Sequence, residues 1–155
     1  MGLWMQRMLV DIGSAQDIVV ASPWFDRKDV TDALVHRMGS GAAVTVLVDS
    51  AAFRERSCFR MRPRLMELVR AGADVYLCKG SPPFGIFHIK AVCTDRRVLY
   101  TGSGNITEKM SSNVELLLRV VGPPVLDVLR SLDEARGAET SVYVGSRSAS
   151  VLDML

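Results

Sequence analysis

Apolar residues in the first half of the chain follow two alternating patterns. Short runs rich in β-branched residues, which are typical of buried strands, cover residues 17–22, 43–49 and 73–78. Stretches in which apolar residues recur every three or four positions, as on one face of a helix, cover residues 5–12, 30–38 and 65–69. Helices between successive strands place those strands parallel in one sheet. The pattern therefore predicts an α/β fold, with Asp26 and Asp29 as capping signals of the second helix.

The second half of the chain predicts a hairpin, another strand and a long helix. The hairpin has its turn at Asp95-Arg96-Arg97, and the helix begins at Pro123 and ends at Gly137. The strands are expected over residues 86–94, 98–101 and 114–121. Together the two halves predict a mixed, largely parallel β-sheet flanked by helices on both faces.

Composition and length fit one folded domain. Of the 155 residues, 48% are hydrophobic and 23% are charged, which is usual for a globular domain and unlike a disordered chain. This length gives one sizeable core and is short for two. We expect a single domain over residues 1–137 and a tail over 138–155, in which residues 141–144 form an edge strand or fray.

Net charge and hydropathy restrict the partners only weakly. A net charge of +2 is too small to indicate a nucleic-acid binder by itself. No apolar run reaches the ~18 residues of a membrane span, and the first six residues lack a basic region followed by an apolar stretch. The sequence therefore predicts no transmembrane helix and no signal peptide.

The three cysteines, Cys58, Cys78 and Cys93, are an odd number without a C-x-x-C pair. This spacing favours neither a disulfide framework nor a zinc site. Cys78 and Cys93 lie in apolar runs and are expected to be buried thiols. Free thiols favour a reducing compartment such as the cytoplasm.

The residues that indicate chemistry begin at the predicted hairpin. His88 and Lys90 are two positions apart, so their side chains are expected on the same face of one strand. Cleavage of a phosphodiester requires a nucleophile, positive charge near the non-bridging oxygens and a proton donor for the leaving oxygen. Histidine supplies the first or the last of these groups, and lysine supplies the charge.

Polar residues after the hairpin complete this set. Asn105 offers a neutral amide donor to a phosphate, Ser103 adds a hydroxyl, and the glycines of Gly102-Ser103-Gly104 allow the backbone to approach an anion closely. Glu115, on the next predicted strand, is suited to accept a proton from the far ring nitrogen of His88. Such a bond fixes the tautomer and leaves the other nitrogen free to attack.

Each of these features alone has an ordinary structural explanation. A single histidine or lysine in a strand is usually structural, and a Gly-Ser-Gly-Asn sequence is usually a turn. A serine hydrolase is disfavoured because no G-x-S-x-G motif is present and because His36, the other histidine, falls within a predicted surface helix.

In order along the chain, H-x-K-x4-D (His88, Lys90 and Asp95), then G-S-x-N and a downstream glutamate, resemble the signature of the phospholipase D superfamily. Residues 15–136 resemble its single-motif members, such as the small bacterial endonuclease and the mitochondrial cardiolipin hydrolase group. This resemblance implies that His88 forms a phosphohistidine intermediate while Lys90 and Asn105 hold the phosphate.

The resemblance also implies roles for the remaining motif residues. Ser103 supports the site, Glu115 orients the histidine, and Asp95 is a structural partner. Active sites of this family combine two motifs and require no metal or other cofactor, whereas this chain has one motif. A second His88 is therefore expected from another copy of the chain, in a homodimer with the active site at the two-fold interface.

An arginine-rich segment between the second strand and the third helix is a candidate for substrate binding. Phe53 and Phe59 are interleaved with its arginines, which are Arg54, Arg56, Arg60, Arg62 and Arg64. Loops at the carboxyl ends of parallel strands border the ligand crevice in α/β folds, and we expect Arg54, Arg56 and Arg60 to bind substrate. A solvated loop explains the segment equally well.

Three functions remain open at this point. DNA or RNA cleavage is favoured, and hydrolysis or transfer on cardiolipin or another anionic phospholipid is the alternative. The third function is an inactive phosphodiester-binding module. Retention of both His88 and Lys90 argues against it.

Overall fold

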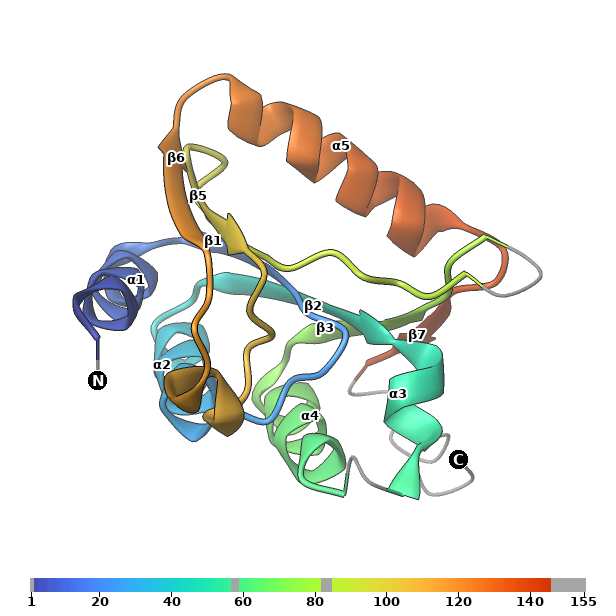
Figure 1. The fold of residues 1–155 in the computed structure, drawn as a ribbon. Coiled ribbons are helices and arrows are strands. Elements are labelled where there is room, and N and C mark those ends of the chain that lie inside the picture. The colour runs from blue at the N-terminus through green and yellow to red at the C-terminus, as the bar shows by residue number, and fades with distance from the viewer. Residues whose placement is uncertain (1, 57–58, 82–84, 146–155) are drawn as a thin grey trace.

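A computed structural model describes residues 2–56, 59–81 and 85–145 of the chain. Its centre is a seven-stranded sheet in the order β6-β5-β4-β1-β2-β3-β7 (Figure 1). The strands are β1 (Asp17–Ala21), β2 (Ala43–Asp49), β3 (Asp74–Cys78), β4 (Ala91–Thr94), β5 (Val98–Gly102), β6 (Leu117–Val121) and β7 (Val142–Val144). Pairing is parallel among β1, β2 and β3 and antiparallel towards both edges. The predicted mixed α/β sheet is confirmed, with its parallel pairs at the centre.

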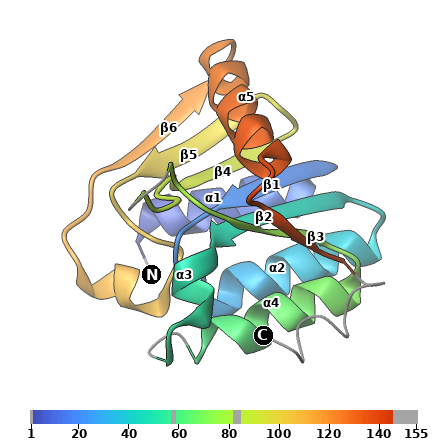
Figure 2. The same ribbon diagram turned by 90° about the vertical axis from the view of Figure 1, so that its right-hand side faces the viewer.

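Helices cover both faces of the sheet. One face packs against α1 (Leu3–Ser14), α2 (Lys28–Gly39) and α4 (Met61–Ala71), and α5 (Pro124–Gly137) lies across the other face (Figures 1 and 2). Two short helices were absent from the sequence-based prediction: α3 (Ser50–Arg54), directly after β2, and the 3₁₀ helix η2 (Glu108–Ser112). Both lie in connections that approach the predicted site.

Two hydrophobic cores follow from this layering. The larger core joins α1, α2 and α4 to the sheet, and its fully buried side chains include Met8, Ile12 and Leu34. The smaller core lies beneath α5 and contains Leu129 and Phe87. The predicted apolar stripe of the first helix is confirmed, because Met5, Met8 and Ile12 are its buried residues.

The motif-bearing ends of two predicted strands are not strands. Residues 86–90 precede β4, whose pairing with β1 ends at Ala21 and Ala91. Residues 114–116 likewise precede β6, whose pairing with β5 ends at Gly102 and Leu117. These segments lie beyond the ends of their neighbours, so they have no ladder to join. The predicted turn is confirmed, with Asp95 and Arg96 at positive φ (50° and 57°), as in a tight hairpin.

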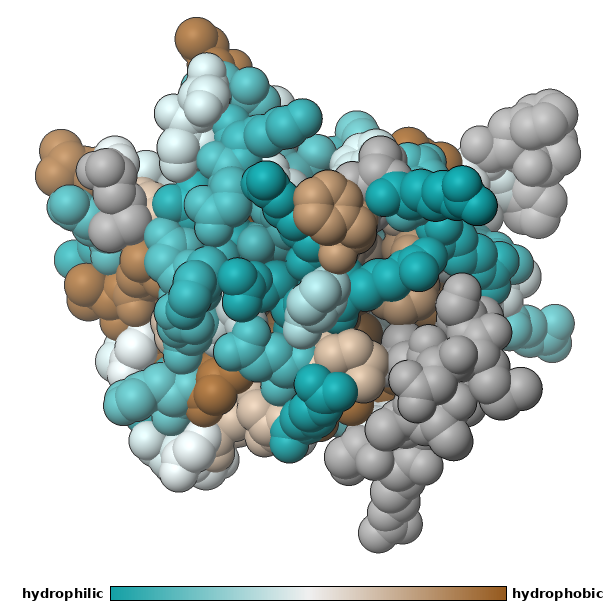
Figure 3. Space-filling view, turned by 90° about the horizontal axis from the view of Figure 1, so that it is seen from below, coloured by the Kyte–Doolittle hydropathy of each residue, from teal (hydrophilic) through white to brown (hydrophobic). Residues whose placement is uncertain are grey.

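Residues 142–144 form β7, which pairs antiparallel with β3 at one edge of the sheet. Of the cysteines, Cys78 and Cys93 are free and buried, whereas Cys58 lies outside the described residues. No helix in the described part of the chain is long and apolar enough to cross a membrane. Seen from below, the surface on the side of α2 and α4 is mainly hydrophilic, and its apolar side chains lie at separate places (Figure 3).

Candidate active site

The predicted site residues gather where the parallel strands end. The segment before β4 reaches this edge because β4 runs antiparallel to β1. The segment after β5 reaches it because β5 is antiparallel to β4. Ser22, directly after β1, holds the second of these segments in place: its Oγ accepts a hydrogen bond of 2.9 Å from the backbone N–H of Ile106. Residues 88–90 and 103–105 therefore share one edge of the sheet.

His88 and Lys90 point to the same side of the chain, as predicted from their spacing. Lys90 Nζ lies 3.0 Å from His88 Nε2 and also donates to the His88 carbonyl oxygen at 3.0 Å. An ammonium has no acceptor, so Nε2 accepts this bond and the ring proton of a neutral imidazole is on Nδ1. The Nε2 lone pair, which a nucleophile requires, is therefore engaged by Lys90 in this structure, and a bound phosphate has to take over the lysine before Nε2 can attack.

Burial distinguishes the two side chains. His88 is exposed, whereas Lys90 is only 8% exposed. The neighbouring Phe87 is buried beneath α5, and its N–H donates to Asp49 Oδ1 at 2.9 Å. Burial lowers the pKa of Lys90, and the negative charge of Glu115 offsets part of this effect. The segment is thus anchored on both sides of a solvent-facing histidine.

Ser103 and Glu115 form a separate cluster beside this pair. The Ser103 hydroxyl donates to Glu115 Oε2, the Asn113 amide donates to Glu115 Oε1 at 3.0 Å, and the Leu116 N–H donates to Ser103 Oγ at 3.0 Å. The hydrogen bonds from Ser103 and Asn113 lower the pKa of Glu115, as does the charge of Lys90. Glu115 is therefore a fixed carboxylate near the lysine.

The expected bond between Glu115 and His88 is not formed within one chain. In the described structure, the Glu115 hydrogen bonds come from Ser103 and Asn113, and the side-chain contact of His88 is with Lys90. The reason is the loop through η2, which brings Glu115 alongside Ser103 instead of into an extended strand beside His88. The orienting role of Glu115 thus stays a prediction, and no bond between Glu115 and His88 within the described residues supports it.

The two glycines of the Gly-Ser-Gly-Asn segment serve close backbone packing. A Cβ atom at Gly102, whose φ is +157°, would lie 1.8 Å from the Leu116 carbonyl oxygen. A Cβ atom at Gly104 would lie 3.0 Å from Met110 Cε and 3.3 Å from Glu115 Cδ. The space predicted for an anion is therefore occupied here by the chain itself.

Asn105 has a buried amide oxygen without a hydrogen-bond partner among the described residues. Its side chain borders a cleft of about 310 Å³, whose other lining residues are Trp24, Phe25, Asp26, Arg60, Met61, Thr107, Lys109 and Asn113. Buried acceptors are rarely left unpaired, and such atoms are frequent at functional sites. Asn105 is thus a lining residue whose amide oxygen still has an unused hydrogen-bonding capacity.

Asp95 lies away from this edge, at the other end of β4. Its Oδ1 accepts hydrogen bonds from the N–H groups of Gln16 (2.8 Å) and Asp17 (3.0 Å), which fastens the hairpin turn to the start of β1. The structural role that was implied for Asp95 agrees with these contacts.

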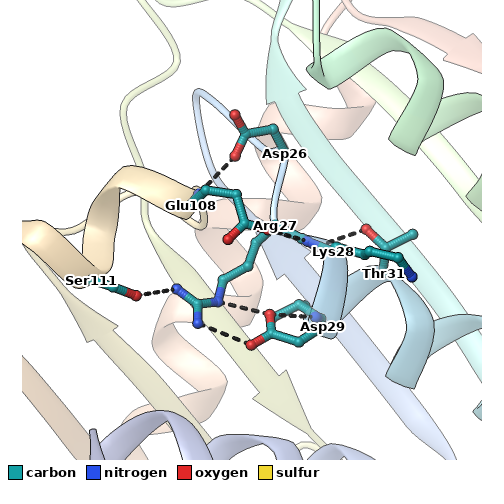
Figure 4. Close-up of polar contacts among 8 residues, drawn as sticks. Asp26, Arg27, Lys28, Asp29, Thr31, Glu108 and Ser111 are labelled. Carbon is teal, nitrogen blue, oxygen red and sulfur yellow. Dashed lines mark hydrogen bonds and ion pairs between the residues drawn. The ribbon is translucent and has the colours of Figure 1, made fainter. Parts of the chain in front are cut away.

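A network that sequence reasoning missed joins η2 to the loop before α2 (Figure 4). Asp26 Oδ1 accepts from the Glu108 N–H at 2.8 Å, and Glu108 Oε1 accepts from the Lys28 N–H at 2.9 Å. The predicted capping of α2 by Asp26 is therefore wrong: the N–H of Lys28, the first residue of α2, is bonded to Glu108, and Asp29 lies in the first turn. The sequence signal was ambiguous, because an aspartate before a helix is the usual sign of a local cap.

Arg27 strengthens this junction from within. It is 5% exposed, donates from Nε and Nη2 to Asp29 at 2.7 and 2.9 Å, and donates from Nη1 to Ser111 at 2.8 Å (Figure 4). Bidentate contacts with a carboxylate are geometrically specific. The loop after β1 thus holds η2 and, through it, the segment from Asn105 to Asn113.

The arginine-rich segment divides between structural and exposed side chains. Arg62 donates to the Phe53 and Arg54 carbonyl oxygens at 2.9 and 3.1 Å, and Arg64 pairs with Glu67 at 3.1 Å. Of the three arginines expected to bind substrate, Arg60 borders the Asn105 cleft. Arg54 borders a second cleft, with Lys79 and Ser81, and Arg56 is exposed.

Comparisons with known proteins agree with this arrangement. A family model described as "Cardiolipin synthase, PLD-like domain" matches residues 8–134. The structure is similar to Nuc, a phospholipase D family member from Salmonella typhimurium (20% identity, TM-score 0.79, covering 92% of this chain and 91% of Nuc). It is also similar to NucT from Helicobacter pylori (18% identity, TM-score 0.75, covering 84% of this chain and 86% of NucT).

A third similar structure is phosphatidylserine synthase from Haemophilus influenzae, at 13% identity and a TM-score of 0.69, covering 90% of this chain and 36% of the synthase. At these identities the structural matches show a common fold. No curated protein sequence matches the chain. Because the family model covers most of the chain, including the whole H-x-K-x4-D motif, the chain belongs to the PLD-like family as a single-motif member of the phospholipase D superfamily.

Proposed function

We propose that this protein is a metal-independent phosphodiesterase, acting most readily as an endonuclease on DNA or RNA. The observation that carries the proposal is the contact between Lys90 Nζ and His88 Nε2, which places a positive charge directly beside the nitrogen that is to attack the phosphorus. Family membership supports phosphodiester chemistry. Asn105, at the same edge of the sheet, can offer its amide NH₂ group to a phosphate oxygen.

In the proposed first step, His88 Nε2 attacks the phosphorus atom and forms an N–P bond while the bond to the leaving oxygen breaks. Lys90 and Asn105 stabilise the charge on the non-bridging oxygens. A second imidazolium protonates the leaving oxygen. Water then attacks the phosphorus and gives its proton to that second imidazole, and the N–P bond breaks to restore His88.

A homodimer supplies the second imidazole in this proposal. The other histidine of the chain, His36, is exposed on α2, in the helix layer, and belongs to no motif. Exposed apolar side chains alternate along the chain beside Glu115, at Val114, Leu116 and Leu118. A two-fold contact over these residues would bury them and bring two copies of the site together.

Nucleic acid is favoured over lipid because of the polar, positively charged surroundings of the site. Arg60 and Lys109 border the Asn105 cleft, and Arg54 and Lys79 border the second cleft. Cations on two sides of a phosphodiester site suit an extended polyanion. The similarity to phosphatidylserine synthase leaves phospholipid hydrolysis or transfer as the outcome to be tested against this one.

The decisive experiment measures cleavage of single-stranded DNA and RNA in EDTA, with cardiolipin vesicles in parallel. We expect the wild-type protein to cut nucleic acid, and His88→Ala and Lys90→Ala to lose at least about 10³-fold in rate, as for removal of a nucleophile or a charge-stabilising group. His36→Ala is the matched control and should retain wild-type rates. Cleavage of cardiolipin alone would select the lipid function, and full activity of His88→Ala would refute the mechanism.

A further inference from the structure

The cleft beside Asn105 extends the proposed phosphate site in one direction. It has a volume of about 310 Å³, near the lower end of the roughly 300–1,000 Å³ typical of small-molecule sites. Its walls come from the loop after β1, the start of α4 and the segment around η2. Asn105 belongs both to this lining and to the proposed phosphate ligands. A chemical group bound in this cleft would therefore be only a few bonds away from the scissile phosphate of the same substrate molecule.

The lining combines one aromatic surface with positive charge. Trp24 is half-buried and supplies an indole to the cleft, and Arg60 and Lys109 are exposed at its border. Asp26 is the carboxylate of the lining, and its Oδ1 is already bonded to the Glu108 N–H. The positive charges of Arg60 and Lys109 therefore attract an anion next to the aromatic face of Trp24. Positive charge beside an aromatic side chain binds nucleotides through phosphate contacts and base stacking.

Hydrogen-bonding groups in the cleft suit a planar heterocycle. The buried Asn105 Oδ1 lacks a donor among the described residues, so the amide gains a hydrogen bond if the side chain turns towards a ligand N–H group in the cleft. Asn113 adds a second amide to the lining, held in place through its bond to Glu115. Both amides stand on the segment that Asp26, Arg27 and Glu108 fasten to the loop carrying Trp24 (Figure 4). The aromatic and polar walls are thus held in one rigid arrangement.

We propose that this cleft binds one unpaired nucleoside next to the scissile phosphate, with its base on Trp24 and its outer phosphate near Arg60 and Lys109. This inference rests on the proposed nuclease function and makes it specific for single strands. A base in a duplex is stacked and paired on both sides, so it would have to leave the helix to enter such a cleft, at a cost in unstacking free energy. A single strand does not incur that cost.

The test measures binding without turnover, in the His88→Ala background. Tryptophan fluorescence and anisotropy are recorded with an oligothymidylate, with the same oligomer carrying abasic sites, and with a duplex. We expect the oligothymidylate to quench Trp24 and to bind about tenfold more tightly than the abasic oligomer or the duplex. Trp24→Leu should remove the quenching and this preference, and Trp24→Phe should restore the preference without the quenching.

Charge variants separate the two walls of the cleft. Arg60→Ala and Lys109→Ala should each weaken binding several-fold and make its salt dependence less steep. Arg130→Ala is the control, because this exposed arginine on α5 is paired with Asp127 on the other face of the sheet. Circular dichroism of each variant verifies folding, and Trp24→Phe keeps the test informative if Trp24→Leu does not fold.

The outcomes separate this inference from the proposed function. If the wild-type protein cuts nucleic acid but the abasic oligomer binds as tightly as the oligothymidylate, the nuclease stands and the base-binding cleft is refuted. If the wild-type protein cuts only cardiolipin vesicles and binds neither oligomer, the proposed function fails and this inference fails with it. Quenching that persists in Trp24→Leu would assign it to Trp4 and overturn the role of Trp24.

Discussion

Lys90 carries the charge of the candidate site in an environment that weakens its hold on the proton. Burial lowers its pKa from the ordinary 10.5, and the charge of Glu115 counteracts only part of that change. The charged form, which the proposed mechanism requires, is therefore lost as pH rises through this lowered pKa. We expect the rate of cleavage to fall in alkaline solution at a pH below 10.5.

The pH dependence of kcat/KM tests this assignment. In Lys90→Arg the guanidinium stays charged throughout the range, so any residual activity should show no alkaline decline from this residue. Glu115 is the neighbouring group whose loss should lower the Lys90 pKa further, and Glu115→Gln should move the alkaline decline to lower pH. An unchanged decline in both variants would assign it to another group.

At the residue level, the sequence selected side chains that the fold brings to one edge of the sheet, and it missed how they are connected. His88, Lys90 and Asn105 were found because their types and spacing match the needs of a phosphodiester. The partners of Glu115 were not found, because they depend on how the loop through η2 folds back onto Ser103. Sequence spacing along a predicted strand contains no information on such a loop.

At the level of elements, a partly exposed ionic cluster ties α1 to the β5–β6 pair. Asp11 on α1 accepts hydrogen bonds from the Tyr100 hydroxyl and from Arg119 Nε at 3.0 Å, and Arg119 Nη2 lies 2.9 Å from the same carboxylate oxygen. Burial alone would raise the pKa of Asp11, but the hydrogen bonds from Tyr100 and Arg119 outweigh it and lower the pKa below 3.8. The cluster therefore favours the ionised, folded state.

A lowered carboxyl pKa stabilises the fold above the unfolded pKa, near 4, and loses this effect as pH falls through the folded value. We expect Asp11→Asn to lower the free energy of unfolding by about 1–2 kcal/mol at pH 7. The difference from wild type should shrink below pH 4. Urea unfolding of wild type and Asp11→Asn at pH 7 and below pH 4 measures this difference in free energy. Asp127→Asn, on the exposed surface of α5, is the control. An equal loss at both pH values would point to altered packing instead of charge.

Element boundaries show where sequence patterns stop being informative. β2 was predicted at its observed ends, Ala43–Asp49, because a central strand buried on both faces reads as a continuous apolar run. The predicted strand over residues 86–94 was too long, because β1 ends and leaves its first residues without a partner. α3 and η2 were missed because each has only five residues and too few turns for a helical period to be visible.

In the whole molecule, the candidate site lies near the outermost strand of the sheet on one side. β6 is the edge strand on this side, and an unpaired edge is a surface that another chain can cover. Val114, Leu116 and Leu118 expose apolar side chains along the approach to this strand, and Leu116 is 65% exposed. Their spacing of two residues places them on one side of an extended chain, with Glu115 between them.

If this surface joins two copies of the chain, a charge on it should abolish both association and catalysis. We expect Leu116→Lys/Leu118→Lys to be monomeric in size-exclusion chromatography with light scattering and to lose cleavage, while its fold is retained. Val10→Lys, which alters an equally exposed apolar residue on α1, should remain dimeric and active. A monomeric double variant with full activity would show that one chain contains the whole site.

Subunit mixing examines the same conclusion without touching the surface. In a site that needs His88 from both chains, a mixed dimer with one His88→Ala chain is inactive. After equal amounts of wild type and His88→Ala exchange subunits, only about a quarter of the dimers hold two wild-type chains, so the activity per wild-type chain should fall to about half. The dependence on the square of the wild-type fraction distinguishes a shared site from two independent ones, for which activity per wild-type chain stays constant. That constancy would remove the reason for the dimer and require a proton donor within the chain.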